Sequence, residues 1–164
     1  MSKERILILD EEANAQWALS EFLESKDFST AVVNSIKQAL EIIKIDNFSA
    51  LITEYRVEQA TTLGVVREFK AAFPEAYVLM LSYGEVGEGE YEEIISTGTD
   101  DFFYKPIDFK KLGLHLEKGL DHRRKLLLKN ELEEELKRLN VKTSTREEPP
   151  PGSTVQQNPH SHPL

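Results

Sequence analysis

Short apolar runs alternate with helical patterns along most of the chain. The runs have the length of buried strands and occupy residues 6–9, 30–33, 50–53, 77–81 and 101–104. Between them, apolar side chains recur at helical spacing, as they do after the N-cap residue Ser35. A strand followed by a helix occurs five times. This order predicts an α/β fold, with a doubly wound parallel sheet of five strands covered by helices on both faces.

The last predicted helix is unusually long. It begins near Asp108, a suitable capping residue, and its pattern continues to about Asn140. Its later part carries a row of four leucines, Leu128, Leu132, Leu136 and Leu139. Four leucines span about two heptads, which is too few to identify a coiled coil. Two interpretations stay open: a solvated helical extension, or a helix that dimerises or docks on a partner.

The C-terminal segment, residues 143–164, differs from everything before it. It holds five of the seven prolines and few large apolar residues. Such a composition buries too little surface to offset the entropy of ordering the chain, which predicts disorder. We therefore expect a domain over residues 1–122, a helical extension with a possible short coiled coil over 123–142, and a disordered tail over 143–164.

Charge and cysteine content narrow the class of protein. The formal net charge of −9 argues against nucleic acid as a partner, because binding to phosphates needs a basic surface. The absence of cysteine excludes disulfides and thiolate metal sites. No apolar stretch is long enough to span a membrane, and the first residues do not form a signal peptide. We expect a cytoplasmic protein with neither a membrane nor a nucleic acid as its partner.

Polar residues follow the predicted strands where the carboxyl ends of a parallel sheet converge. They are Asp10, Glu11 and Glu12, then Glu54, then Ser82, and finally Lys105 followed by Pro106. Paired carboxylates bind hard cations such as Mg²⁺, and a lysine beside them can neutralise a carboxylate or a phosphoryl group. Acids also stabilise the first turns of helices. Their joint placement at successive strand ends favours a site over capping alone.

Four segments carry a family resemblance: ILILDEEA, SALITEY, VLMLSYG and GTDDFFYKPID. Over residues 4–122 the chain resembles the receiver domain of bacterial two-component response regulators, which implies a flavodoxin-like (βα)5 fold with, here, an extended C-terminal helix. Asp10 and Glu11 match the acidic pair that helps to bind magnesium in this family. Glu54 matches the aspartate that accepts a phosphoryl group from a histidine kinase.

The same resemblance assigns roles near the fourth and fifth strands. Ser82 matches the hydroxyl residue that contacts the phosphoryl oxygen, and Phe102 matches the aromatic switch position. Lys105 matches the lysine that pairs with the phosphoryl group. Pro106 matches the proline after that lysine, which usually follows a cis peptide bond.

Departures from the family pattern affect the expected chemistry. Glu54 replaces the phosphoacceptor aspartate and carries its carboxyl one carbon farther out, about 1.5 Å. Misplacement on this scale can slow phosphoryl transfer by about 100-fold. The following loop lacks the usual proline, and Arg56 stands where a backbone carbonyl completes the magnesium shell. Asp10 and Glu11 leave a weak metal site, so Mg²⁺ is possible but is not expected to be required.

These observations predict an atypical receiver, or pseudo-receiver, that is not an enzyme. It would act in phosphorelay signal transduction as a phosphorylation-independent protein-interaction module, with a signalling protein or a histidine kinase as its partner. One alternative is a conventional phosphoacceptor receiver, and another is a structural homodimer built on the C-terminal helix. We expect Lys105 to pair with Glu54 or Asp10. The resting state of the switch stays open, but a Ser82 hydroxyl turned away from Glu54 together with an exposed Phe102 would contradict a constitutively active arrangement.

Overall fold

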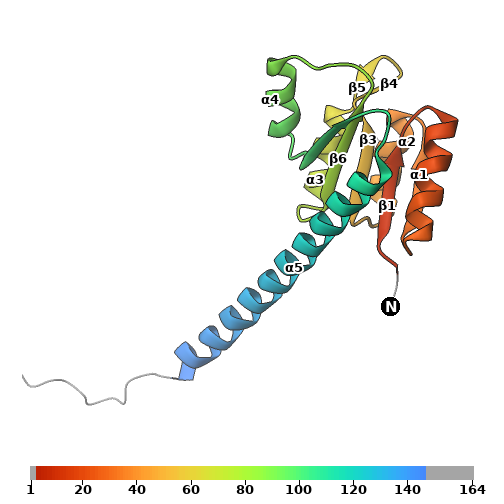
Figure 1. Cartoon of the computed structure of the whole chain (residues 1–164). Helices are drawn as coiled ribbons and strands as arrows, with labels where there is room; N and C mark the ends of the chain where they lie inside the picture. Colours follow the sequence, from red (N-terminus) through yellow and green to blue (C-terminus); the bar gives the residue numbers. More distant parts are fainter. Residues whose placement is uncertain (1–2, 147–164) are drawn as a thin grey trace, which may run out of the picture. The chain divides into compact units, whose positions relative to one another are not determined.

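Seven strands and five helices follow one another in residues 3–146, the part of the chain that the computed structural model describes (Figure 1). The strands are β1 (Arg5–Leu9), β2 (Ser29–Val33), β3 (Ala50–Glu54), β4 (Arg56–Val57), β5 (Ala60–Thr61), β6 (Tyr77–Ser82) and β7 (Asp101–Tyr104). The helices are α1 (Ala13–Ser25), α2 (Ile36–Ile45), α3 (Leu63–Ala72), α4 (Glu88–Ser96) and α5 (Phe109–Arg146). Each apolar run in the sequence became a strand whose ends lie within one residue of the predicted ends.

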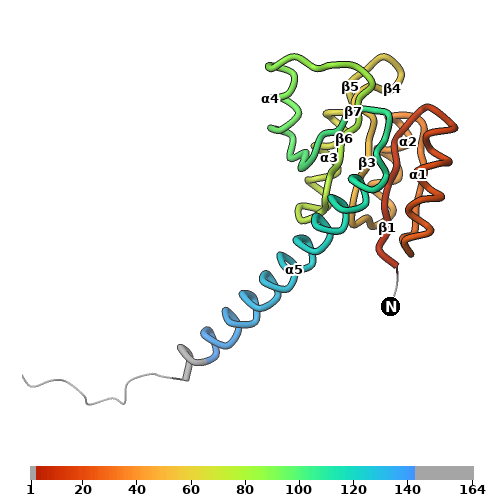
Figure 2. Tube along the Cα trace, viewed as in Figure 1, coloured from red at the N-terminus to blue at the C-terminus, as the bar shows by residue number. Residues whose placement is uncertain are grey.

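The five long strands form one parallel sheet in the order β2-β1-β3-β6-β7 (Figure 2). The chain moves outward from β1 to β2 and then returns to the other side of β1 with β3. The direction of winding therefore reverses between β1 and β3, where doubly wound sheets place their binding sites. Residues at the carboxyl ends of these two strands lie side by side, as the pairing of Leu9 with Thr53 shows. The predicted fold class is confirmed.

The sheet has an apolar cluster on each face. One cluster joins the sheet to α1 and α5, through buried residues that include Leu19, Leu23, Leu112, Leu116 and Leu120. The other joins it to α2, α3 and α4, through residues that include Ala39, Val66, Phe69 and Ile94. Successive residues of β1 alternate between the two clusters, because neighbouring side chains of a strand point to opposite faces. Burial on both faces explains why the strands read as continuous apolar runs.

Local signals in the sequence set several helix ends. The Ser35 hydroxyl accepts a hydrogen bond from the Gln38 amide at 3.1 Å and caps α2. The Asp108 carboxylate accepts one from the Lys111 amide at 3.2 Å and caps α5. Gly98 follows α4 with a φ of +95°, which glycine adopts at little cost. The N-terminal caps predicted at Ser35 and Asp108 are therefore confirmed.

A short hairpin after β3 was not predicted. Strands β4 and β5 pair in antiparallel fashion, and the two residues between them, Glu58 and Gln59, have φ values of 54° and 63°. Two consecutive positive φ angles are typical of the tight turns that join hairpin strands. Figure 2 shows the hairpin at the end of the sheet opposite the start of β1. It therefore forms part of the edge where the predicted site residues meet.

The chain divides into two compact units, Met1–Leu127 and Leu128–Leu164. The first unit extends five residues beyond the predicted boundary at residue 122, because α5 continues through it without a break. Helix α5 ends at Arg146, so the first four residues of the predicted tail are helical, and residues 147–164 lie outside the described part of the chain.

The second unit exposes the predicted row of leucines. Leu128, Leu132, Leu136 and Leu139 are each between 52% and 58% exposed. None of the helices in residues 3–146 combines the length and the apolar character needed to cross a membrane.

Candidate functional site

Three charged side chains from separate strand ends meet in a buried cluster. Asp10 follows β1, Glu54 is the last residue of β3, and Lys105 follows β7. The Lys105 ammonium nitrogen lies 2.7 Å from Asp10 Oδ2 and 2.7 Å from Glu54 Oε2. Its side chain is only 2% exposed, and those of Asp10 and Glu54 are 6% and 9% exposed. The predicted pairing of Lys105 is thus confirmed with both acids at once.

Burial and neighbouring charge determine the ionisation of this cluster. Burial raises the pKa of the Glu54 carboxyl, and the charges of Asp10 and Glu12 add to that rise, while contact with Lys105 opposes it. Burial disfavours the charged form of Lys105, but its contacts with Asp10 and Glu54 outweigh burial and raise its pKa. The ammonium group is therefore held in its charged form between the two carboxyls.

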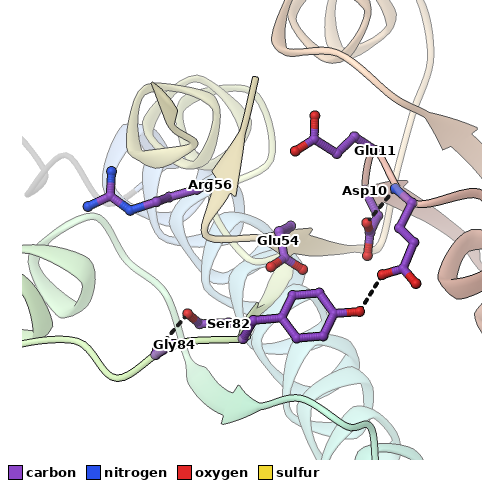
Figure 3. Close-up of a pocket in the computed structure, with 8 residues that line it drawn as sticks. Asp10, Glu11, Glu54, Arg56, Ser82 and Gly84 are labelled. Carbon is purple, nitrogen blue, oxygen red and sulfur yellow. Dashed lines mark hydrogen bonds between the residues drawn. The ribbon is translucent and has the colours of Figure 1, made fainter. Parts of the chain in front are cut away.

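Asp10 and Glu54 of this cluster form the floor of a pocket of about 350 Å³. Asp10 and Glu54 face it, as Figure 3 shows, and Glu11 and Arg56 stand at its rim. Glu11 Oε2 accepts a hydrogen bond from the backbone amide of Glu58 at 3.1 Å, which links the β1–α1 loop to the hairpin. The Arg56 guanidinium lies 3.7 Å from a carboxylate oxygen of Glu90. The rim residues are thus engaged with neighbouring elements.

The predicted magnesium ligands do not converge on a common point. Asp10 Oδ1 accepts a hydrogen bond from the Glu12 amide at 3.0 Å, and Asp10 Oδ2 contacts Lys105. Glu11 is turned toward Glu58 of the hairpin. Within residues 3–146, no three acidic or histidine side chains lie close enough together to hold a metal ion. Mg²⁺ needs near-octahedral oxygen coordination, which this arrangement does not supply. We therefore assign no step at this site to a metal ion.

The side chains of the two predicted switch residues contact groups outside the charged cluster. The Ser82 hydroxyl donates a hydrogen bond to the Gly84 carbonyl at 2.9 Å instead of pointing to Glu54 (Figure 3). Phe102 is half-buried and contacts the rings of Tyr91 and Tyr104 edge-on, at centroid distances of 6.1 Å and 5.3 Å. Of the two conditions that contradict a constitutively active arrangement, the hydroxyl orientation is met and exposure of Phe102 is not.

Pro106 follows a cis peptide bond to Lys105, as the resemblance implied.

Two further contacts at the site were missed in the sequence. The Thr62 hydroxyl, which is fully buried, donates to the backbone carbonyl of Glu54 at 2.7 Å and so fixes the end of β3. The Tyr83 hydroxyl donates to the Glu12 carboxylate across the pocket. Neither contact has a sequence signal, because each joins residues from different elements.

Solved structures identify the class of fold. A receiver domain protein described as CheY-like, from Methanospirillum hungatei JF-1, superposes with a TM-score of 0.71 at 18% identity, covering 76% of this chain and 98% of its own. A chain described as adenylate cyclase from Rhodopirellula baltica gives a TM-score of 0.70 at 24% identity, covering 81% and 98%. At these identities the likeness establishes the fold, a CheY-like parallel α/β domain.

The sequence identifies the family. The model of the response regulator receiver domain matches residues 6–117, so this chain belongs to that family and is a receiver domain of the two-component type. The transcriptional regulatory protein ZraR of Escherichia coli K12 is 31% identical over 118 residues, which are 71% of this chain and 26% of that protein. The rice two-component response regulator ORR3 is 27% identical over 105 residues, 62% and 79% of the two chains. This chain spans about a quarter of the length of ZraR.

Proposed function

We propose that this receiver domain is an atypical one, a non-enzymatic, phosphorylation-independent protein-interaction module of a cytoplasmic signalling pathway. The observation that carries the proposal is the pair of 2.7 Å contacts from Lys105 to Asp10 and Glu54. In the family pattern, Glu54 stands at the phosphoacceptor position and Lys105 is the partner of the phosphoryl group. Here the lysine is already engaged by two internal carboxylates.

Phosphorylation at Glu54 would face two obstacles. Transfer to either oxygen would consume the carboxylate charge that contacts Lys105 through Oε2, and it would place a phosphoryl group in a buried cluster whose ammonium already contacts Asp10 and Glu54. The metal ligands that would otherwise balance the charge of an incoming phosphoryl group do not converge. Since phosphoryl transfer depends on positioning and on charge neutralisation, both arguments favour a site that keeps its negative charge and has lost the transfer reaction.

A phosphodonor assay tests this proposal. The purified chain is incubated with MgCl₂ and acetyl phosphate, and its intact mass is followed over time. We expect no phosphoryl adduct on the native chain. A matched Glu54→Asp variant restores the aspartate of the family. Its extent of phosphorylation shows how much of the lost reactivity is due to the extra methylene carbon of glutamate. An adduct on the native chain that hydroxylamine removes would identify an acyl phosphate and would support the alternative, a conventional phosphoacceptor.

The partner in this proposal is a protein with a basic surface, and its docking surface is the exposed face of α4 and β7. Tyr91, Phe102 and Tyr104 form a row of edge-on aromatic contacts there. Helix α4 also carries four glutamates, Glu88, Glu90, Glu92 and Glu93. Exposed aromatic rings beside acidic side chains suit lysine and arginine side chains. A Glu88→Lys/Glu92→Lys double variant should therefore weaken binding of a basic amphipathic peptide in an NMR titration, whereas Glu75→Lys on the α3–β6 loop should not.

The exposed leucine row of α5 supports a second candidate function, self-association. Four leucines more than half exposed along one helix form a surface that a second copy of the same helix would cover. Analytical ultracentrifugation of the native chain and of a Leu132→Lys/Leu136→Lys variant tests it. A native dimer that the double variant converts to a monomer is the expected outcome. A native monomer at high concentration would exclude this candidate.

A further inference from the structure

Tyr83 and Glu12 connect two loops across the mouth of the acidic pocket. Tyr83 directly follows β6, and Glu12 directly precedes α1. The Tyr83 hydroxyl donates a hydrogen bond to the Glu12 carboxylate, drawn as a dashed line in Figure 3. Both residues line the pocket whose floor holds Asp10 and Glu54. The contact thus joins two loops that both line the pocket.

The Tyr83 ring also contacts Lys105 of the charged cluster. The Lys105 ammonium lies 4.5 Å from the centroid of the Tyr83 ring, within the range of a cation–π contact. The same ammonium contacts Asp10 and Glu54 at 2.7 Å. The Tyr83 ring therefore lies over the charged cluster, and its hydroxyl is hydrogen-bonded to Glu12.

The Tyr83 side chain is largely exposed to solvent. The residue is 63% exposed, whereas its neighbour Ser82 is buried. Moving the ring away from the pocket would break the hydrogen bond to Glu12 and the contact with Lys105, but it would leave the apolar clusters of the sheet unchanged, since Tyr83 belongs to neither. Motion of an exposed side chain of this kind is fast and involves no unfolding.

We propose that Tyr83 acts as a strap that closes the pocket and controls the access of small molecules to Glu54, Ser82 and Lys105. The strap concerns the pocket of the proposed function and deepens it, because it adds a barrier to phosphodonors that is separate from the replacement at position 54. A hydrogen bond at this exposed position favours the closed form over the open form by about threefold to tenfold.

A thiol placed beneath the strap measures the barrier directly. The chain contains no cysteine, so a Ser82→Cys substitution introduces a single thiol into the pocket wall. Its rate of reaction with methyl methanethiosulfonate, a small neutral reagent, is followed by intact mass. A Ser96→Cys variant, with an exposed thiol on α4, gives the rate for an uncovered position.

The rate is then compared between strap variants in the Ser82→Cys background. Tyr83→Ala should raise the rate by about threefold to tenfold, towards that of Ser96→Cys. Tyr83→Phe should give an intermediate rate, because it loses the bond to Glu12 and keeps the ring over Lys105. Trp17→Ala removes an exposed aromatic side chain on α1 that does not line the pocket, and it should leave the rate unchanged.

Labelling rates that agree within about twofold between tyrosine and alanine at position 83 would refute the proposed role of Tyr83. That result would leave the proposed function intact, because thiol labelling involves no phosphoryl group and no metal. Conversely, a phosphoryl adduct on the native chain would refute the proposed function, and the labelling rates would still decide whether Tyr83 covers the pocket.

Discussion

Replacing Lys105 by methionine would leave two buried carboxylates without the ammonium group that contacts both of them. The Lys105 side chain is 2% exposed, and its two contacts measure 2.7 Å each. Solvent screening therefore reduces this interaction far less than it reduces a surface ion pair. Removing one partner from a buried ion pair destabilises proteins by about 3–5 kcal/mol, because the remaining charge stays uncompensated. We expect a loss of that size for Lys105→Met at neutral pH.

Urea unfolding followed by circular dichroism measures this loss. For a slope of about 2 kcal/mol/M, the unfolding midpoint should fall by about 2 M. Lys37→Met is the matched control, because Lys37 forms an exposed pair with Glu41 at 4.0 Å, and such pairs contribute at most about 0.5 kcal/mol. In the Lys105→Met background, Glu54→Gln should restore part of the stability, since it removes one of the two uncompensated charges.

The pH dependence gives this prediction a definite sign. Burial already raises the pKa of Glu54 in the native chain, and loss of Lys105 removes the contact that opposes that rise. A carboxyl whose pKa is higher in the folded state binds protons more readily there, so folding becomes more favourable as the pH falls through that range. The deficit of Lys105→Met should therefore shrink as the pH falls from neutral towards the ordinary pKa of glutamate, about 4.3. A loss below about 1 kcal/mol, or a deficit that is constant with pH, would refute this reasoning.

Three variants elsewhere test the packing and the hairpin by the same unfolding assay. Gly119→Ala should destabilise the domain by about 1–3 kcal/mol, because a Cβ there would stand 2.2 Å from the buried Tyr77 ring. Gly64→Ala, whose Cβ would meet nothing within 4 Å, should instead stabilise the domain by roughly 0.5 kcal/mol. If both glycine substitutions changed the stability in the same direction, this account of the packing would be contradicted. The double change Glu58→Asn/Gln59→Gly should stabilise by about 1 kcal/mol, because these residues adopt positive φ more readily. An unchanged midpoint would show that the hairpin turn is not strained.

The sheet and the buried cluster could be predicted because both depend on strong local signals. A strand covered on both faces must be apolar at consecutive positions, and five such runs define the sheet. Once the strands are parallel, their carboxyl ends share one edge, so Asp10, Glu54 and Lys105 had to lie near one another.

Other features depend on contacts that leave no local pattern. The β4–β5 hairpin turns on Glu58 and Gln59, which lack the usual preference for positive φ, so nothing in the sequence marks the turn. Tyr83 and Glu12 are 71 residues apart, and their contact depends on side-chain placement. Trp17, by contrast, is 69% exposed, whereas Leu19 and Leu23 of the same helix are buried. At 3.6 residues per turn, Trp17 falls on the opposite side of α1 from Leu19.

The contacts in the pocket also determine which residues respond to the charge of Glu54. Glu54 is linked to the end of β7 through Lys105, which lies three residues from Phe102. It is not linked to the end of β6 through Ser82, because that hydroxyl donates to Gly84. A bound phosphoryl group carries about −1.5 to −2 charges and several acceptor oxygens, and it could engage a lysine and a hydroxyl together. A single carboxylate that already shares Lys105 with Asp10 engages only the lysine. Of the contacts that the family resemblance assigns to a phosphoryl group, Glu54 thus reproduces the one with Lys105 and not the one with the Ser82 hydroxyl.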